Sequence, residues 1–352
     1  MLMIIFYHAF YHLKVTGDAV PASESHFSFN IVIGYLLGSW GLVGVGCFFL
    51  ISAYFLIDNS QSFGIKKILR LILQVIFWSF VMLVLSIKLK VYPDNDSLLK
   101  GIVMSVVSPF LGIYWFITAY IFMYILYPFL NQFIKKADLK LYRKVIIILT
   151  VIVPVFTFGR GQNLGQNLTS CDLGIALYYY LLCGYLKRTP GNFFERYAVK
   201  IFWITNILTV VLEIICDLIP PLTKAGISRL QGRNSIFAII SAVALFYIFK
   251  NLKIKPSKII NTIAKGTLGV YLIHESPFWS DKLWNNLINL DFYFETSYYF
   301  IVFYIVSVLT IYCIAVFMDL ARLNFLEKPL FKLKIPFLEK WFNKFDSFIK
   351  DN

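Results

Sequence analysis

Residues 34–58 read GYLLGSWGLVGVGCFFLISAYFLID, an apolar stretch whose first charged residue is Asp58. A helix needs about 20 apolar residues to cross the hydrocarbon core of a bilayer, and this stretch exceeds that length. Its crowded glycines would let another helix approach its backbone closely, which is typical of helices packed inside a membrane. The stretch therefore predicts a membrane-spanning helix, with limits near 31–57.

The rest of the 352-residue chain has the same character, with 59% hydrophobic and 15% charged residues. Soluble proteins average about 25% charged residues, and one water-soluble core of this size could not bury so much apolar surface. We predict an all-α integral membrane protein, a bundle of about ten transmembrane helices. The ten apolar runs are 1–13, 31–57, 68–87, 113–134, 145–158, 173–186, 201–219, 234–249, 266–279 and 298–321.

Basic residues are unevenly distributed among the segments between these runs. Most of the 33 lysines and arginines lie in alternate segments, including 135–144 and 250–265, and in the tail 322–352. Cytoplasmic loops carry an excess of lysine and arginine, so this alternation predicts that both termini are cytoplasmic. The net charge of +14 then reflects topology and contact with anionic membrane lipids, and no nucleic acid partner is expected.

A few ionisable side chains lie inside the apolar runs, where their cost makes them candidates for function. His8 lies in the first run, and a neutral imidazole can accept a proton from a hydroxyl near neutral pH, which suits acyl or proton transfer. His274 and Glu275 precede Pro277, a pattern that indicates a broken helix end lining a cavity. Each could instead be a hydrogen-bonded packing or interfacial residue, and the sequence leaves both interpretations open.

Other residues are candidates for ligand binding. Arg70 lies at the start of the third run, after Lys66 and Lys67, and these three residues could hold phosphates or could anchor the helix on the cytoplasmic side. Gly44 and Gly46 could let a long thin ligand approach the backbone, or could serve only helix packing. The cysteines form no metal-ligand spacing, and no metal site is predicted.

Four local patterns occur in order along the chain. They are IIFYH at 4–8, GLVGVGCFFLISAYFLI at 41–57, KKILR at 66–70 followed by YWFITAYIFMYILYPFL at 114–130, and LGVYLIH at 268–274. Together they resemble the membrane acyltransferase 3 family. The family's signature of a glycine, two adjacent phenylalanines and a serine is found here at Gly44, Phe48, Phe49 and Ser52, with Ala53 where the family has glycine.

This resemblance implies an enzyme that transfers an acetyl group from acetyl-CoA to a hydroxyl of a cell-surface or exported polysaccharide, at the bacterial inner membrane. The expected partners are acetyl-CoA, a glycan or lipid-linked glycan acceptor and membrane lipids, with no permanently bound cofactor. The implied site has His8 as the catalytic residue, Lys66, Lys67, Arg70, Gly44 and Gly46 at the donor, and Ser52, Tyr120, His274 and Glu275 as oxyanion or acceptor contacts. A transporter or flippase of lipid-linked glycans is the alternative, because glycine-rich spans with buried polar residues also suit transport.

We expect one acyltransferase-like transmembrane domain over 1–321 and a basic amphipathic cytoplasmic tail over 322–352, either helical on the inner leaflet or partly ordered. The family places a basic residue ahead of its first-helix histidine, at a distance that falls before residue 1 here. The first run, 1–13, is also shorter than a full span. Both observations lead us to expect a truncated N-terminal helix.

Overall fold

The computed structural model describes residues 1–13, 28–58, 64–92, 97–156, 172–219, 222–296 and 298–332, which form helices and no strand. The first half contains α1 (Leu2–Tyr11), α2 (Phe29–Gly38), α3 (Trp40–Asp58), α4 (Ile65–Lys88), α5 (Leu98–Val107), α6 (Trp115–Lys136), α7 (Leu139–Thr150) and η1 (Val151–Phe156). The second half contains α10 (Leu173–Arg188), α11 (Phe193–Leu218), α12 (Thr223–Leu230), α13 (Ile236–Asn251), α14 (Lys258–Lys265), α15 (Thr267–His274), α16 (Ser280–Lys282), η3 (Leu283–Ile288), α17 (Leu290–Thr296), α18 (Phe300–Arg322), η4 (Leu323–Glu327) and α19 (Lys328–Lys332).

Five helical stretches of the described chain are long and apolar enough to cross a bilayer. They are Phe29–Asp58, Ile65–Lys88, Trp115–Lys136, Phe193–Leu218 and Phe300–Leu330. The all-helical, multi-pass membrane fold is thus confirmed, and each of the ten apolar runs contains a helix. The number of spans and the side of each terminus stay predictions.

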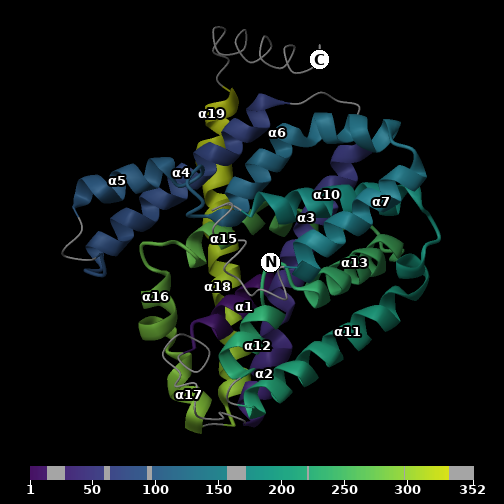
Figure 1. Cartoon of the computed structure of the whole chain (residues 1–352). Coiled ribbons are helices and arrows are strands. Elements are labelled where there is room, and N and C mark those ends of the chain that lie inside the picture. The colour runs from purple at the N-terminus through teal and green to yellow at the C-terminus, as the bar shows by residue number, and fades with distance from the viewer. Residues whose placement is uncertain are drawn as a thin grey trace.

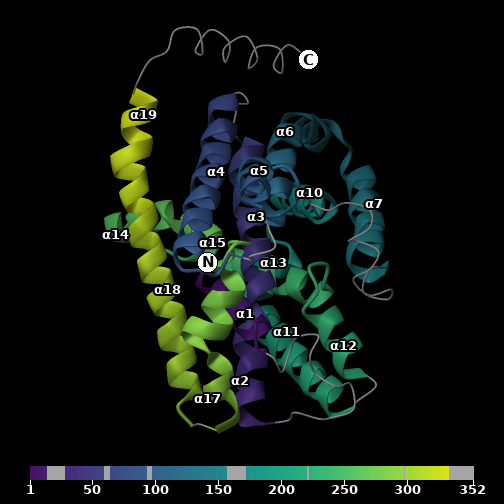
Figure 2. The ribbon, with the colours of Figure 1, turned by 90° about the vertical axis from the view of Figure 1, so that its left-hand side faces the viewer.

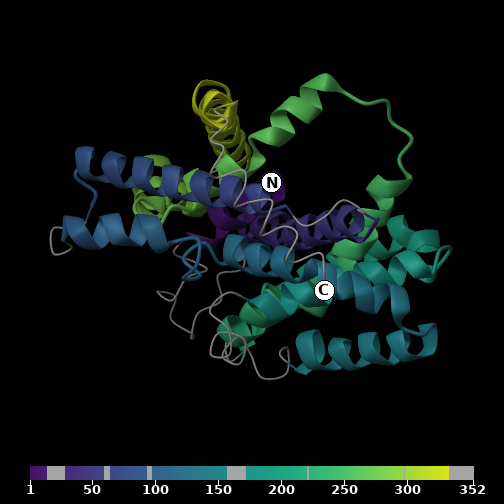
Figure 3. The same ribbon diagram turned by 90° about the horizontal axis from the view of Figure 1, so that it is seen from above.

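The helices form an elongated bundle. In Figures 1 and 2, α18 runs along the bundle from α17 at one end to α19 at the other. Seen from above, the segment between α13 and α15 swings away from the other helices (Figure 3). This segment contains α14, which has no buried residue and exposes Ile259 and Ile260. An amphipathic helix of this kind, with Lys258 and Lys265 at its ends, suits the membrane surface.

The tail expected over 322–352 begins inside a helical continuation of α18. η4 and α19 carry the chain from Leu323 to Lys332. The remainder of the predicted amphipathic tail, 333–352, lies outside the described residues.

Glycines of α2 and α3 let α1 pack directly on their backbones. A Cβ atom added at Gly41 would lie 2.0 Å from Tyr7 Cβ, and one added at Gly34 would lie 2.0 Å from Phe10 Cε2. On another side of α1, the hydroxyl of Tyr304 in α18 donates a hydrogen bond to the carbonyl of Phe6. The short α1 is therefore held between long helices, which fixes the position of its polar side chains.

A buried polar network joins α4 to α18. The carboxylate of Asp319 is fully buried and accepts hydrogen bonds from Trp78 Nε1 at 2.7 Å, Gln74 Nε2 at 3.1 Å and Arg322 Nε at 2.6 Å. Gly269 of α15 packs on the same side chain, because a Cβ there would lie 2.3 Å from Asp319 Cβ. Asp319 thus fixes α4, α15 and α18 relative to one another.

We expect the substitution Asp319→Ala to lower the free energy of unfolding by about 3 kcal/mol, because it leaves the buried Arg322 without one of its carboxylate partners. Thermal unfolding of the purified protein in detergent measures the effect. Asp58→Ala is the matched control, since Asp58 pairs with Lys187 but its side chain is 67% exposed, and such pairs contribute about 1 kcal/mol or less. Equal unfolding midpoints for the two variants would contradict the structural role of Asp319.

Candidate active site

A cavity of about 720 Å³ lies between α1, α3, α4, α6, α15 and the segment 229–235. Basic residues line it in two places: Lys67 and Arg70 at the start of α4, and Arg229 and Arg233 beside the start of α13. Along the bundle, α1 and α15 lie between α4 and α12 in both side views (Figures 1 and 2). The polar residues of α1 and α15 are therefore placed between two cationic regions of one cavity.

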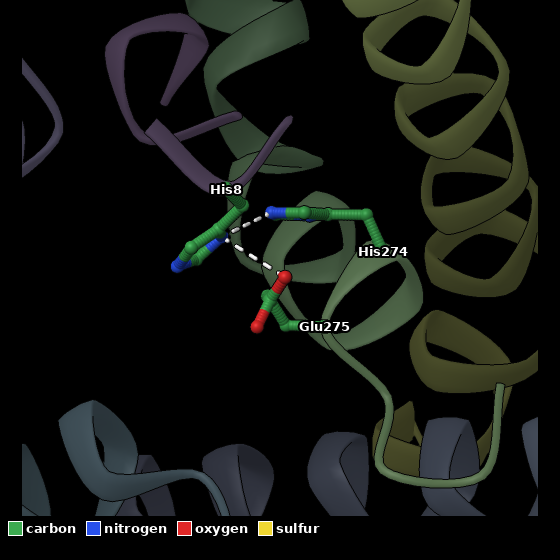
Figure 4. A group of neighbouring side chains, drawn as sticks. All are labelled: His8, His274 and Glu275. Carbon is green, nitrogen blue, oxygen red and sulfur yellow. Dashed lines mark hydrogen bonds and ion pairs between the residues drawn. The ribbon is translucent and has the colours of Figure 1, made fainter. Parts of the chain in front are cut away.

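His8, His274 and Glu275 meet at this intermediate position, although they lie far apart in the sequence. His8 Nδ1 lies 2.9 Å from His274 Nε2 and 3.3 Å from Glu275 Oε1. Figure 4 shows the other ring nitrogen of His8 directed away from both partners. His8 and Glu275 line the cavity, whereas His274 is fully buried behind them.

The hydrogen bonds assign the tautomers of the two histidines. His274 Nδ1 lies 2.5 Å from the carbonyl of Val270, and since a carbonyl only accepts, this nitrogen carries the proton. His274 Nε2 is then an acceptor, so the proton between the rings belongs to His8 Nδ1. The remaining nitrogen of His8, Nε2, keeps its lone pair. A histidine with a free Nε2 and a carboxylate beside its Nδ1–H has the arrangement of a general base.

The end of α15 positions His274 and Glu275. The helix stops at His274, as the sequence predicted from Pro277, and its last carbonyls accept hydrogen bonds from side chains. Trp279 Nε1 donates to Ile273 O at 2.6 Å and the hydroxyl of Tyr114 donates to Leu272 O at 3.3 Å. Because a broken helix in a membrane needs partners for its free carbonyls, these two bonds stabilise the break.

His12 of the α1 C-terminus contacts Glu275 on the side of α16. His12 Nε2 lies 3.6 Å from Glu275 Oε1, and His12 Nδ1 lies 3.6 Å from Asp281 Oδ1. The buried indole of Trp284 stacks on the His12 ring, with 6.1 Å between ring centroids. Glu275 is thereby placed between two imidazoles, and of these only His8 lines the cavity.

The structure brings together some of the other predicted site residues and separates the rest. Ser52, Tyr120, Lys67 and Arg70 line the cavity, and Lys66 does not. His274 does not line it either: it is fully buried, and its ring contacts His8 and the carbonyl of Val270.

The predicted donor contacts at Gly44 and Gly46 also fall outside the cavity lining. A Cβ at Gly44 would lie 3.2 Å from Ile4 Cγ1, and one at Gly46 would lie 2.6 Å from Ala242 Cβ. Both glycines serve helix packing here, and Gly41 is the glycine of α3 that reaches the cavity.

Sequence reasoning missed the wall formed by residues 229–235. Arg233 lies over the ring of Trp115, 4.3 Å from its centroid, and forms an ion pair with Asp172. Gln74, which the Asp319 network orients, also lines the cavity. The signal in the sequence was the pair Arg229 and Arg233, two basic residues in a segment predicted to be external, where few are expected.

The ligand atoms of His8, His274 and Glu275 all lie within 4.8 Å of one another, a separation that would allow them to share a metal ion. The sequence predicted no metal. The hydrogen bond between the rings of His8 and His274 places a proton where a shared metal ion would have to lie. A hydrogen-bonded histidine pair and a metal site therefore exclude each other, and the effect of a chelator on activity distinguishes them.

A family model described as an acyltransferase domain matches residues 1–318. The chain belongs to the acyltransferase 3 family. No curated protein and no solved structure matched the chain in the corresponding comparisons. Membership of this family, together with the membrane-spanning helices, makes the protein a multi-pass membrane acyltransferase. The resemblance drawn from the sequence patterns is confirmed over nearly the whole described chain.

Proposed function

We propose that this acyltransferase 3 protein moves an acetyl group from acetyl-CoA to a hydroxyl of a cell-surface or exported polysaccharide, in the bacterial cell membrane. The observation that carries the proposal is the placement of His8. Its Nδ1 is held by His274 and Glu275, and it lines a cavity with cationic residues in two separate regions. An acyl transfer needs a base at the acceptor hydroxyl and a path for a large anionic donor, and this cavity offers both.

The region near Lys67 and Arg70 suits the donor. CoA carries phosphates, and arginine can bind a phosphate with two parallel hydrogen bonds. The predicted topology puts the start of α4 at the cytoplasmic side, where acetyl-CoA is found. The thioester arm would then extend toward His8, along a wall that includes Leu71 and Gln74 of α4.

In the proposed reaction His8 Nε2 takes the proton of the acceptor hydroxyl, while the hydroxyl oxygen forms a bond to the thioester carbonyl carbon. The hydroxyls of Ser52 and Tyr120 line the cavity and are donors suited to the oxyanion that develops on that carbonyl. The carbon–sulfur bond then breaks, and the CoA thiolate takes the proton back from His8. The products are the O-acetyl ester and CoA, and the base is restored.

The acceptor would reach His8 from the region of residues 229–235. The predicted topology assigns this segment to the outer side of the membrane, opposite the start of α4. An exported glycan, free or lipid-linked, is present on that side. Donor and acceptor would thus approach the same imidazole from different regions of the cavity, which explains why one site is lined by two separate cationic groups.

The proposal is tested with the purified protein in nanodiscs, radiolabelled acetyl-CoA and a panel of neutral and acidic oligosaccharides. We expect one CoA released per acetyl ester formed on an oligosaccharide, and the same rate after dialysis against a chelator. Loss of activity on chelation and its return with Zn²⁺ would instead support a metal at His8, His274 and Glu275. A transporter or flippase would release no CoA in the presence of any acceptor, and that result would contradict the proposal.

A further inference from the structure

The wall of the cavity beside α13 has the features of an anion-binding site. Ser235 precedes the first residue of α13, lines the cavity and is 2% exposed. The first backbone N–H groups of a helix have no partner inside the helix, and they form its positive end. Ser235 does not cap them with its side chain. The N-cap residue of this 16-residue helix therefore lies on the cavity wall, and the free N–H groups and partial positive charge of the helix start lie next to it.

Two polar atoms of this wall are buried without a hydrogen-bond partner among the described residues: Ser235 Oγ and Arg229 Nε. A buried donor left unpaired costs about 1–3 kcal/mol, so such atoms usually indicate a missing ligand or water. Both residues line the same cavity. Both residues belong to the wall that ends at the start of α13.

Charge balance in this region favours an anion. Arg233 already pairs with Asp172 and lies over Trp115. The carboxylate of Glu213 accepts a hydrogen bond from Gln231 at its Oε1, and Glu213 does not line the cavity. Two carboxylates line the cavity within the described residues: Asp172, which pairs with Arg233, and Glu275, which contacts His8 and His12. Arg229 has no carboxylate partner in the described chain, so a positive charge remains for a ligand.

We propose that Arg229, Ser235 and the N-terminus of α13 bind an anionic group of the acceptor, a carboxylate or a phosphate carried by the glycan. This inference rests on the proposed function, because it names the chemical class of acceptor for the same cavity. The bound anion would hold the glycan with a hydroxyl near His8, and the Arg233–Trp115 pair would lie beside the next unit of the chain. A purely neutral glycan would leave the arginine charge and the helix terminus without partners.

Direct binding in detergent free of charged lipid tests this proposal without any acyl transfer. The probes are trigalacturonate, its carboxyl-reduced neutral counterpart and tri(glycerol phosphate), measured by calorimetry. We expect at least one acidic probe to bind about tenfold or more tightly than the neutral trisaccharide. Preference for trigalacturonate or for tri(glycerol phosphate) distinguishes a carboxylate from a phosphate on the acceptor.

Variants locate the binding. Arg229→Gln should weaken the acidic probe about tenfold to hundredfold, and Ser235→Ala about threefold to tenfold, with little change for the neutral probe. Arg143→Gln is the matched control, since Arg143 is exposed, bonds to the Tyr185 hydroxyl and does not line the cavity. Because Ser235→Ala removes a single atom, it keeps the test valid if Arg229→Gln fails to fold.

Two results would overturn the inference. One is equal affinity of the neutral and both acidic probes for the wild-type protein. The other is a loss of acetyl-CoA affinity in Arg229→Gln as large as the loss for the acidic probe, which would assign the site to the donor. If acidic probes bound but no CoA were released in the transfer assay, the proposed function would be contradicted and the anion-binding site would still be supported.

Discussion

Replacing His8 with alanine is expected to lower the turnover rate of acetyl transfer by about 10²–10⁴-fold, the usual contribution of a general base. The physical reason is that His8 Nε2 is a free imidazole lone pair on the cavity wall, held by two contacts at Nδ1. No other histidine among the described residues lines the cavity. The assay measures O-acetyl ester formed from radiolabelled acetyl-CoA, with the KM for acetyl-CoA expected to change little.

The control for this prediction is His12→Gln. His12 contacts the same carboxylate, 3.6 Å from Glu275 Oε1, but it does not line the cavity. We expect a loss of about tenfold for this variant, because it removes support for Glu275 and leaves the base in place. Normal activity of a folded His8→Ala protein would remove His8 from the mechanism.

Glu275→Gln is expected to have the second-largest effect, a decrease in turnover of about 10²-fold or more. The carboxylate faces His8 Nδ1–H at 3.3 Å and stabilises the positive charge that His8 gains when it takes a proton. An amide has the same size, but it carries no charge and can present an N–H to the ring, which favours the wrong tautomer. Binding of acetyl-CoA should be unchanged, so the loss should fall on kcat and not on KM.

The variant Glu275→Asp tests the role of the charge itself. It keeps the carboxylate on a shorter side chain, and we expect part of the activity lost in Glu275→Gln to return. If Glu275→Gln and Glu275→Asp were equally impaired and both unfolded at a lower temperature than wild type, Glu275 would serve the packing of α15 and not the chemistry.

The sequence predicted the long helices well, because apolar runs as long as a bilayer is thick have few other interpretations. It missed α5, whose ten residues Leu98–Val107 include Lys100 and were assigned to a loop. It predicted a break ahead of Pro277 in the run over 266–279, but it could not show that α16 follows this break at Ser280. Helix breaks depend on partners such as Trp279 and Tyr114, which hydrophobicity does not reveal.

The sequence also singled out His8, His274 and Glu275, each because an ionisable group is costly in an apolar run. It could not predict that His8 and His274, which are 266 positions apart, share a hydrogen bond. Because this contact depends on the tertiary structure, the sequence also could not show that His274 is buried behind His8. The glycines of α3 could not be interpreted from the sequence, because close helix packing and the approach of a ligand both require a small residue. In the structure, the side chains next to Gly44 and Gly46 show that both glycines lie at helix contacts.

The anion-binding wall proposed at residues 229–235 is the part of the site that sequence patterns describe least. Its residues, such as Gly232, Asn234 and Ser235, are common in loops. Their role depends on the orientation of the start of α13 toward the cavity, which is a property of the tertiary structure.

The most direct measurement of the central claim is an experimental structure of the protein with a non-transferable acetyl-CoA analogue. We predict that the nucleotide phosphates contact Lys67 and Arg70 and that the acetyl carbonyl carbon lies in the cavity within about 5 Å of His8 Nε2, close enough for one acceptor oxygen to bridge them. An analogue bound with its acetyl group outside this cavity, or with its phosphates at Arg229 and the start of α13, would contradict this prediction.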